Sequence, residues 1–384
     1  MLYISIITYT VLSGLFLSAC QRKVFVQLSN RKLGLKLGAI SLPLLIILVT
    51  NDSCTDFYAY VRIFNRASFD TLATTDQEIG WMLLNSIVKN VITTDGVVGI
   101  NFIRGLTFVL FIYAIAKMHE FIDIGWGWIA FVCMCYFNIF SMVAFMIAVA
   151  FVLLAFENVL MKKHARMIIE LILAISMHYT AVIPSFALIL YFLCYGRKYT
   201  RKGFVLLSLC GALVIGVLAR SLFSYAVAVL PFLTKYAKYG TYVAGGTGLR
   251  QLVNYLPIFW CLYHTAWKSQ NRTMNLSFIS ALVGFTVGMC SYSINNLLRT
   301  YLYFSFLYIV YLSALIRNNE QNMYVSEEKS NAKEIKKNNG HIPFTPNSFK
   351  FLVLLYLIYR VYYLLASEWA TGISSGFGNF HFLF

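Results

Sequence analysis

The residues best suited to chemistry are one histidine, His178, and a set of basic residues in or beside apolar segments. A neutral imidazole is a natural proton acceptor near pH 7. Arginine binds phosphate oxygens through a planar fork, and an ionised side chain within a bilayer usually faces a cavity. The basic residues of this kind are Arg62, Arg66, Lys89, Arg104, Arg220, Lys235, Lys238, Arg250, Arg299 and Arg360. Together they predict a site that binds closely spaced negative charges, such as a pyrophosphate, and removes a proton.

Each of these residues also has a simpler explanation. A basic side chain near a membrane surface often extends to the lipid headgroups. A histidine within the membrane is more often a hydrogen-bonded contact between helices than a catalyst. As a group, however, the basic residues outnumber the acids suited to pair with them, which include Asp52, Asp56 and Glu78. This surplus of positive charge favours an anionic ligand.

The composition requires that the chain lie in a membrane. Of its 384 residues, 59% are hydrophobic and 12% are charged, whereas a soluble domain carries roughly 25% charged residues. The excess apolar surface must face lipid. The net charge of +16 comes mainly from basic residues in short loops, where they orient the chain, and no nucleic-acid motif is present. The eight cysteines show no CxxC spacing, so neither a disulfide framework nor a metal site is predicted.

The apolar segments predict an all-α integral membrane protein with about 12 transmembrane helices, forming a single polytopic domain over residues 1–384. A straight span needs about 20 residues, so two of the segments, 167–177 and 181–195, are too short alone. The segments are roughly 2–19, 33–50, 97–117, 124–139, 141–160, 167–177, 181–195, 203–221, 249–267, 276–291, 296–316 and 349–367.

The orientation follows from the basic loops, which mark the cytoplasmic side. With twelve spans, all of these loops fall on one side, and both termini lie outside. Two larger extracytoplasmic loops then cover about 51–95, with an interfacial helix at 81–91, and about 222–248, and a flexible cytoplasmic loop covers about 317–347. The basic loops contain Arg22, Lys23, Arg31, Lys32, Lys162, Lys163, Arg166, Arg197, Lys198, Arg201, Lys202, Lys268 and Arg272.

The segment 167–195 is flanked by basic loops at both ends, so the chain must enter from the cytoplasm and return there. This predicts a re-entrant-like hairpin that turns near His178, Tyr179 and Thr180. The turn places His178 at or just below the outer surface, where irregular backbone is tolerated only inside protein or beside water. The alternative is one long tilted helix, which would put the basic loop at 197–202 outside.

Four motifs resemble a known family when they are taken in order. They are Thr55-Asp56-Phe57-Tyr58-Ala59-Tyr60, then Glu78-Ile79-Gly80-Trp81, then Met177-His178-Tyr179-Thr180-Ala181, then Leu298-Arg299-Thr300-Tyr301-Leu302-Tyr303-Phe304. Over roughly residues 50–310 the chain resembles the EpsG-like group of Wzy-type polysaccharide polymerases.

The resemblance implies a GT-C-like membrane glycosyltransferase that is metal-independent and has no cofactor. The stereochemistry stays open, and a direct displacement by one base-activated hydroxyl would make the enzyme inverting. Such enzymes polymerise undecaprenyl-pyrophosphate-linked oligosaccharide repeat units into O-antigen, capsule or exopolysaccharide. They work in the bacterial inner membrane, with the active site on the extracytoplasmic side. The implied partners are these lipid-linked oligosaccharides and membrane lipid. A chain-length regulator is a further candidate partner, and nucleic acid is not expected to bind.

The resemblance and the residue types together assign the candidate site. We expect His178 to be the catalytic base, with Glu78 and Asp56 as reserve candidates. The pyrophosphate is expected to bind Arg104, Arg250, Arg299 and Arg62, and the sugars to stack on Tyr58, Tyr60 and Tyr242. The family commonly has a basic residue near the start of its fifth span, whereas this chain has none at 140–145. Arg104 is therefore expected to take over part of that role.

Three other functions remain open at this point. A flippase or other transporter for the same lipid-linked oligosaccharide would also need a basic cavity, but transporters often show an internal repeat and this chain shows none. A GT-C enzyme that transfers single sugars usually has acidic residues in its first external loop, where Asp52 and Asp56 lie. A membrane acyltransferase could also use His178 as its base.

Overall fold

The computed structural model describes residues 2–24, 30–52, 56–72, 77–193, 202–229, 272–290, 303–304, 307–317 and 346–371. These residues form helices and no strands, which confirms the predicted all-helical class. They divide into two compact units. One is drawn from Met1–Ala181, Tyr308–Met323 and Pro346–Phe384, the other from Val182–Leu307 and Tyr324–Thr345. The single domain over residues 1–384 stays a prediction.

Within the described ranges, five helical segments are long and apolar enough to cross a membrane. Four belong to or form α1 (Leu2–Val24), α2 (Asn30–Val49), α5 (Gly96–Lys117) and α8 (Val143–Leu160). The fifth joins α6 (Ile124–Phe131), a π-helical turn at Val132–Tyr136 and α7 (Phe137–Ser141). All five agree with the predicted apolar segments. The total of twelve stays a prediction, since the predicted span 249–267 lies outside the described residues.

The helix break predicted near His178 is present. The helix α9 (His164–Met177) ends there, a 3-10 turn follows at Tyr179–Ala181, and α10 (Val182–Leu193) begins directly after it. His178 itself is extended, with φ −158° and ψ 117°. The two helices are too short to be full spans, as expected, and the re-entrant hairpin stays a prediction.

The second unit contains α10, α11 (Lys202–Val229) and α13 (Arg272–Cys290). The helices α11 and α13 pack closely, because a side chain at Gly216 would begin 2.7 Å from Cβ of Met289. The predicted loop at 222–248 begins as helix, since α11 runs past residue 221, and the end of the membrane span itself stays a prediction. The helix continues to Val229 because residues 222–229 are themselves mostly apolar, and the rest of the predicted loop to 248 lies outside the described residues.

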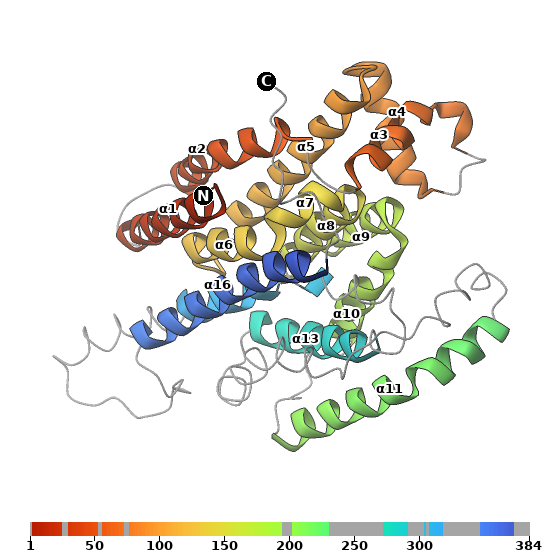
Figure 1. Cartoon of the computed structure of the whole chain (residues 1–384). Coiled ribbons are helices and arrows are strands. Elements are labelled where there is room, and N and C mark those ends of the chain that lie inside the picture. The colour runs from red at the N-terminus through yellow and green to blue at the C-terminus, as the bar shows by residue number, and fades with distance from the viewer. Residues whose placement is uncertain are drawn as a thin grey trace, which may run out of the picture. The chain divides into compact units, whose positions relative to one another are not determined.

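The predicted external loop at 51–95 is largely helical. It holds α3 (Phe57–Arg66), a 3-10 turn at Phe69–Thr71 and α4 (Ile79–Val91), which lie beside the start of α5 (Figure 1). A helix was predicted at 81–91, and α4 contains it, whereas α3 was not predicted. In α3, Phe57 and Phe64 are buried while Arg62 and Arg66 are exposed. An apolar face on the protein and a basic face outward explain why this short segment is helical.

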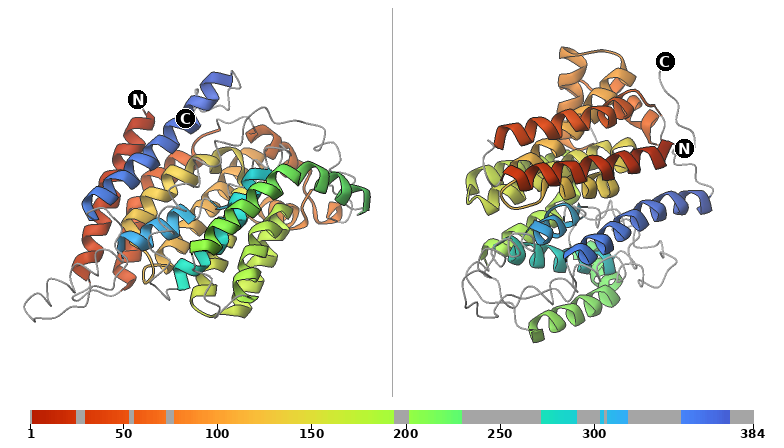
Figure 2. Two further views of the ribbon diagram at one scale, coloured as in Figure 1. Left: turned by 90° about the horizontal axis from the view of Figure 1, so that it is seen from below. Right: turned by 90° about the vertical axis from the view of Figure 1, so that its left-hand side faces the viewer.

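The membrane-length helices of the first unit run in nearly the same direction in Figure 2, so their ends gather at two opposite sides of that unit. At one end, Lys36 near the start of α2 donates to the thiol of Cys20 near the end of α1, at 3.4 Å. Gln21 of α1 donates to the carbonyl of His119 in the loop between α5 and α6, at 3.1 Å. We call this the basic end.

Two further contacts place other helix termini at the basic end. Lys117, the last residue of α5, pairs with Glu157 near the end of α8 at 2.9 Å, and the Glu157 carboxylate is fully buried. Arg317, which follows the π-helical turn at Tyr308–Leu312, donates to the carbonyl of Ile122 at 3.2 Å. The termini flanking the basic loops before residue 181 thus lie together, as the orientation argument requires.

We expect the basic end to face the cytoplasm. In a cysteine-free background, Thr94→Cys beside the start of α5 should react with a membrane-impermeant maleimide in intact cells. Lys162→Cys, in the turn between α8 and α9, should react only after permeabilisation. Arg201→Cys, outside the described residues, should behave like Lys162→Cys. Labelling of Lys162→Cys in intact cells would contradict this orientation.

Two glycines set the close contact between α1 and α6. A Cβ atom on Gly125 would lie 2.0 Å from the carbonyl oxygen of Gly14 and 2.6 Å from the backbone nitrogen of Ser18. Backbone atoms cannot rotate away as a side chain can. Nearby, the hydroxyl of Ser18 donates to the Asp123 carboxylate at 2.7 Å, which joins the same two helices.

Gly125→Ala should therefore lower the free energy of unfolding by about 1–3 kcal/mol, as overpacking typically does. The measurement is thermal unfolding of the purified protein in detergent. Gly38→Ala on α2 is the matched control, since a Cβ there meets nothing within 4 Å. It should be neutral or stabilising by about 0.5–1 kcal/mol, because alanine favours a helix over glycine. Equal melting temperatures for the two variants would refute the close contact.

Candidate functional site

The end of the first unit opposite the basic end is organised around Arg104 of α5. One terminal nitrogen of its guanidinium donates to the carbonyl of Asn51, at 2.7 Å, and to the side-chain oxygen of Asn101, at 3.0 Å. The other donates to the carbonyl of Phe140. The guanidinium carbon lies 4.3 Å from the ring centre of Phe57 and 5.7 Å from that of Phe140. We call this the Arg104 end.

These contacts tie together the ends of α2 and α7 and the first residue of α3. A buried charge is tolerated where hydrogen bonds and aromatic faces replace water, and Arg104 obtains both. Its side chain is 0% exposed. The predicted contact between Arg104 and pyrophosphate therefore requires an intermediary or a rearrangement.

His178 lies at the Arg104 end, half-buried where α9 stops. Its Nδ1 is 2.6 Å from the hydroxyl oxygen of Thr180. Its ring packs edge-on against Phe145 in the first turn of α8, with ring centres 5.3 Å apart. The backbone nitrogen of His178 still donates to the carbonyl of Ala174, at 3.0 Å. The imidazole is thus fixed by both its backbone and its ring.

Glu78 is brought to the same region by close packing of α4 on α9. It precedes the first residue of α4, and its side chain makes no capping hydrogen bond there. Two residues later, a Cβ on Gly80 would lie 2.3 Å from the hydroxyl of Ser176 and 2.8 Å from the Ser176 carbonyl carbon. The start of α4 therefore touches α9 two residues before His178, so Glu78 and His178 extend from backbones in contact.

The helix α3 carries two of the three predicted sugar-binding tyrosines, Tyr58 and Tyr60. Tyr58 is 52% exposed and donates to the carboxylate of Asp52 at 2.9 Å. This hydrogen bond, with burial and the negative charge of Asp52, raises the pKa of Tyr58 above its ordinary value. Tyr60 packs edge-on against Trp81 of α4, with ring centres 5.4 Å apart. Arg62 is exposed one turn beyond Tyr58.

The described part of the chain thus brings several predicted site residues to one end of the first unit. Asp56 joins them at the residue before α3, where it makes no capping hydrogen bond. No group of His, Cys, Asp or Glu among the described residues could hold a metal ion. The residues gathered are Asp56, Tyr58, Tyr60, Arg62, Glu78, Arg104 and His178, whereas Tyr242, Arg250 and Arg299 lie outside the described residues.

A family model for the EpsG family matches residues 36–326, about three quarters of the chain. The chain belongs to the EpsG family. The match confirms the family suggested by the four motifs and extends beyond the predicted 50–310 at both ends. No curated protein and no solved structure matches the chain. The family is consistent with a membrane protein of polysaccharide biosynthesis.

Asn101 is the residue of this EpsG protein that sequence reasoning missed. It is 4% exposed, and its side-chain oxygen accepts from Arg104. The sequence feature that could have indicated this hydrogen bond is the spacing of Asn101 and Arg104, which are three residues apart and hence on one helix face. The other acceptors of Arg104, the carbonyls of Asn51 and Phe140, could not have been found from residue types.

We expect Arg104→Met to destabilise the protein, because it leaves the Asn51 and Phe140 carbonyls without this donor. An unsatisfied buried group costs about 1–3 kcal/mol, so the melting temperature in detergent should fall clearly. Arg62→Met on the exposed face of α3 is the control, and it should stay within about 0.5 kcal/mol of wild type. An Arg104→Met protein with unchanged stability but lost activity would argue for direct ligand binding instead.

Proposed function

We propose that this EpsG protein polymerises undecaprenyl-pyrophosphate-linked oligosaccharide repeat units at the outer face of a bacterial inner membrane. The observation that carries the proposal is the grouping of His178, Glu78, Asp56 and the α3 tyrosines at one end of the first unit, in a chain of this family. The product would be O-antigen, capsule or exopolysaccharide. The full arrangement of about twelve spans in a GT-C-like fold is part of the proposal.

In the proposed reaction, a hydroxyl of the acceptor sugar attacks the anomeric carbon of the donor sugar. A new glycosidic bond forms, and the bond from that carbon to the pyrophosphate oxygen breaks. The lipid pyrophosphate leaves with the electron pair, and the hydroxyl proton passes to the base. A single displacement of this kind inverts the anomeric carbon.

His178 is assigned as the base through its Nε2 atom. When Nδ1 carries a proton and donates to Thr180, the basic lone pair of the neutral ring lies on Nε2. Thr180 is then a positioning residue that orients the ring, and Phe145 holds the ring plane. Glu78 and Asp56 are the reserve bases, and neither is used in a capping hydrogen bond.

The leaving pyrophosphate develops negative charge that cations must stabilise. We assign this role to Arg62, Arg250 and Arg299, with Arg104 contributing its charge from the interior. The reaction as proposed needs no metal ion, since arginine forks bind phosphate oxygens directly. Tyr58, Tyr60 and Tyr242 are assigned to the sugars.

The deciding experiment is polymer formation by purified protein supplied with a polyprenyl-pyrophosphate-linked repeat unit, read as a ladder on a gel. General-base assistance contributes about 10²–10⁴-fold. His178→Ala and His178→Gln should each lose this factor at matched expression, since glutamine can hydrogen-bond but cannot take the proton. Thr180→Val should lose less, because it removes only the group that orients the ring.

The matched control is His164→Gln, at the opposite end of the same helix α9. It should give a normal ladder. A near-normal ladder from His178→Gln would move the assignment to Glu78 or Asp56. Movement of the lipid-linked unit across vesicles without extension would favour a flippase.

A further inference from the structure

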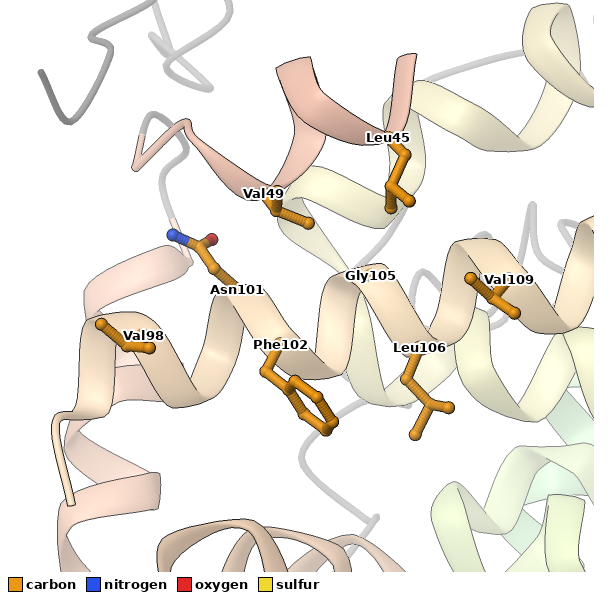
Figure 3. Close-up of a pocket in the computed structure, with 8 residues that line it drawn as sticks. All are labelled: Leu45, Val49, Val98, Asn101, Phe102, Gly105, Leu106 and Val109. Atoms are coloured by element: carbon orange, nitrogen blue, oxygen red, sulfur yellow. The ribbon is translucent and has the colours of Figure 1, made fainter. Parts of the chain in front are cut away.

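A groove of about 550 Å³ runs between α2 and α5, two of the membrane-length helices of the first unit. Its size lies within the ~300–1,000 Å³ of small-molecule sites. Figure 3 shows Leu45 and Val49 of α2 across from Gly105, with the other lining residues following one another along α5. Phe102 and Val109 are 43% and 49% exposed, so the groove opens at the surface of the unit.

Among the described residues that line the groove, Asn101 is the one polar residue. Its side-chain oxygen is fixed toward Arg104, because only an acceptor can face a guanidinium. The amide nitrogen, Nδ2, is therefore the atom left over, and it has no hydrogen-bond partner among the described residues. It is also buried, so a ligand in the groove reaches it only when neighbouring side chains shift. Because buried donors in proteins normally have an acceptor, we expect a ligand in the groove to supply one.

The charge behind Asn101 specifies the acceptor. The Arg104 guanidinium lies 3.0 Å from the Asn101 oxygen, so the amide is polarised and its N–H groups become stronger donors. A negatively charged oxygen at Nδ2 would also interact with the buried positive charge one amide away. The complementary group is a phosphate oxygen.

The positions of the polar and apolar lining residues along α5 set the direction in which a ligand would lie in the groove. Asn101 lies near the Arg104 end, and the apolar lining continues along α5 to Val109, so Val98 to Val109 spans about 16 Å. A ligand with its phosphate at Asn101 would extend its apolar chain toward the middle of the helix. One continuous groove fits one chain better than the two chains of a phospholipid.

We propose that this groove binds a polyprenyl phosphate or pyrophosphate lipid, with the phosphate at Asn101 and the isoprenoid chain between α2 and α5. The proposal rests on the proposed function, because it places the lipid carrier of that reaction. It also gives Arg104 an indirect contact with phosphate, through Asn101.

The test is photolabelling of the purified protein in uncharged phosphatidylcholine nanodiscs with a twenty-carbon polyprenyl phosphate that bears a terminal diazirine. Peptide mapping should place the label on α2 near Leu45 or on α5 between Phe102 and Val109. Unlabelled polyprenyl phosphate should compete for the site, whereas phosphatidic acid should not.

Asn101→Asp is the sharpest variant, because it keeps an acceptor for Arg104 and removes the Nδ2 donor. Loss of a hydrogen bond to a charged group should weaken binding about 10- to 100-fold. Leu106→Trp should abolish labelling by filling the groove. Leu12→Trp, on the 64% exposed position of α1, is its control and should label as wild type does. Melting temperatures confirm that each variant is folded.

Labelling only outside the groove, equal competition by phosphatidic acid, or unchanged labelling of both groove variants would overturn the proposal. None of these readouts uses polymer formation. A wild-type protein that makes polymer but labels elsewhere would refute the groove and leave the proposed function standing. A wild-type protein that labels in the groove but makes no polymer would do the reverse.

Discussion

A charged side chain enclosed in a helical bundle needs hydrogen-bond acceptors, and Arg104 takes its acceptors mainly from the backbone. The carbonyls of Asn51 and Phe140 lie at or near the ends of α2 and α7, where helical carbonyls lack partners within their own helix. A single guanidinium thus satisfies two helix termini and packs on Phe57 of α3. The ends of α2 and α7 and the start of α3 are held together by that one group.

The candidate catalytic groups lie on the segments attached to this centre rather than on it. Asp56 directly precedes Phe57, which packs against Arg104. His178 packs against Phe145, five residues beyond Phe140. The position of Glu78 is set by the contact of Gly80 with Ser176. These residues lie at helix ends, and the rigid helices beside them limit how far they can move. This is the usual division between a scaffold and the residues that act on substrate.

The sequence was sufficient to locate the long helices and the break at His178. Runs such as 97–117 and 141–160 are apolar over a full span, and they became Gly96–Lys117 and Val143–Leu160. The short helix α3 was missed because only Phe57 and Phe64 of its ten residues are buried. The enclosure of Arg104 was also missed, because backbone carbonyls carry no signature of residue type. The groove depends on tertiary packing of α2 on α5, which no local pattern encodes.

The length of α9 has a consequence for the membrane that surrounds the protein. The helix begins beside Lys162 and Lys163, which belong in water. Its 14 residues rise about 21 Å before the helix ends at His178. The hydrocarbon core of a bilayer is about 30 Å thick, and any tilt shortens the rise further. If the basic end lies at the membrane surface, as we propose, α9 ends within the depth of the lipid. Hydrophobic mismatch then makes the thickness of the host bilayer a determinant of how readily water reaches the imidazole. Acyl-chain length in the membrane thereby becomes part of the environment of the proposed base.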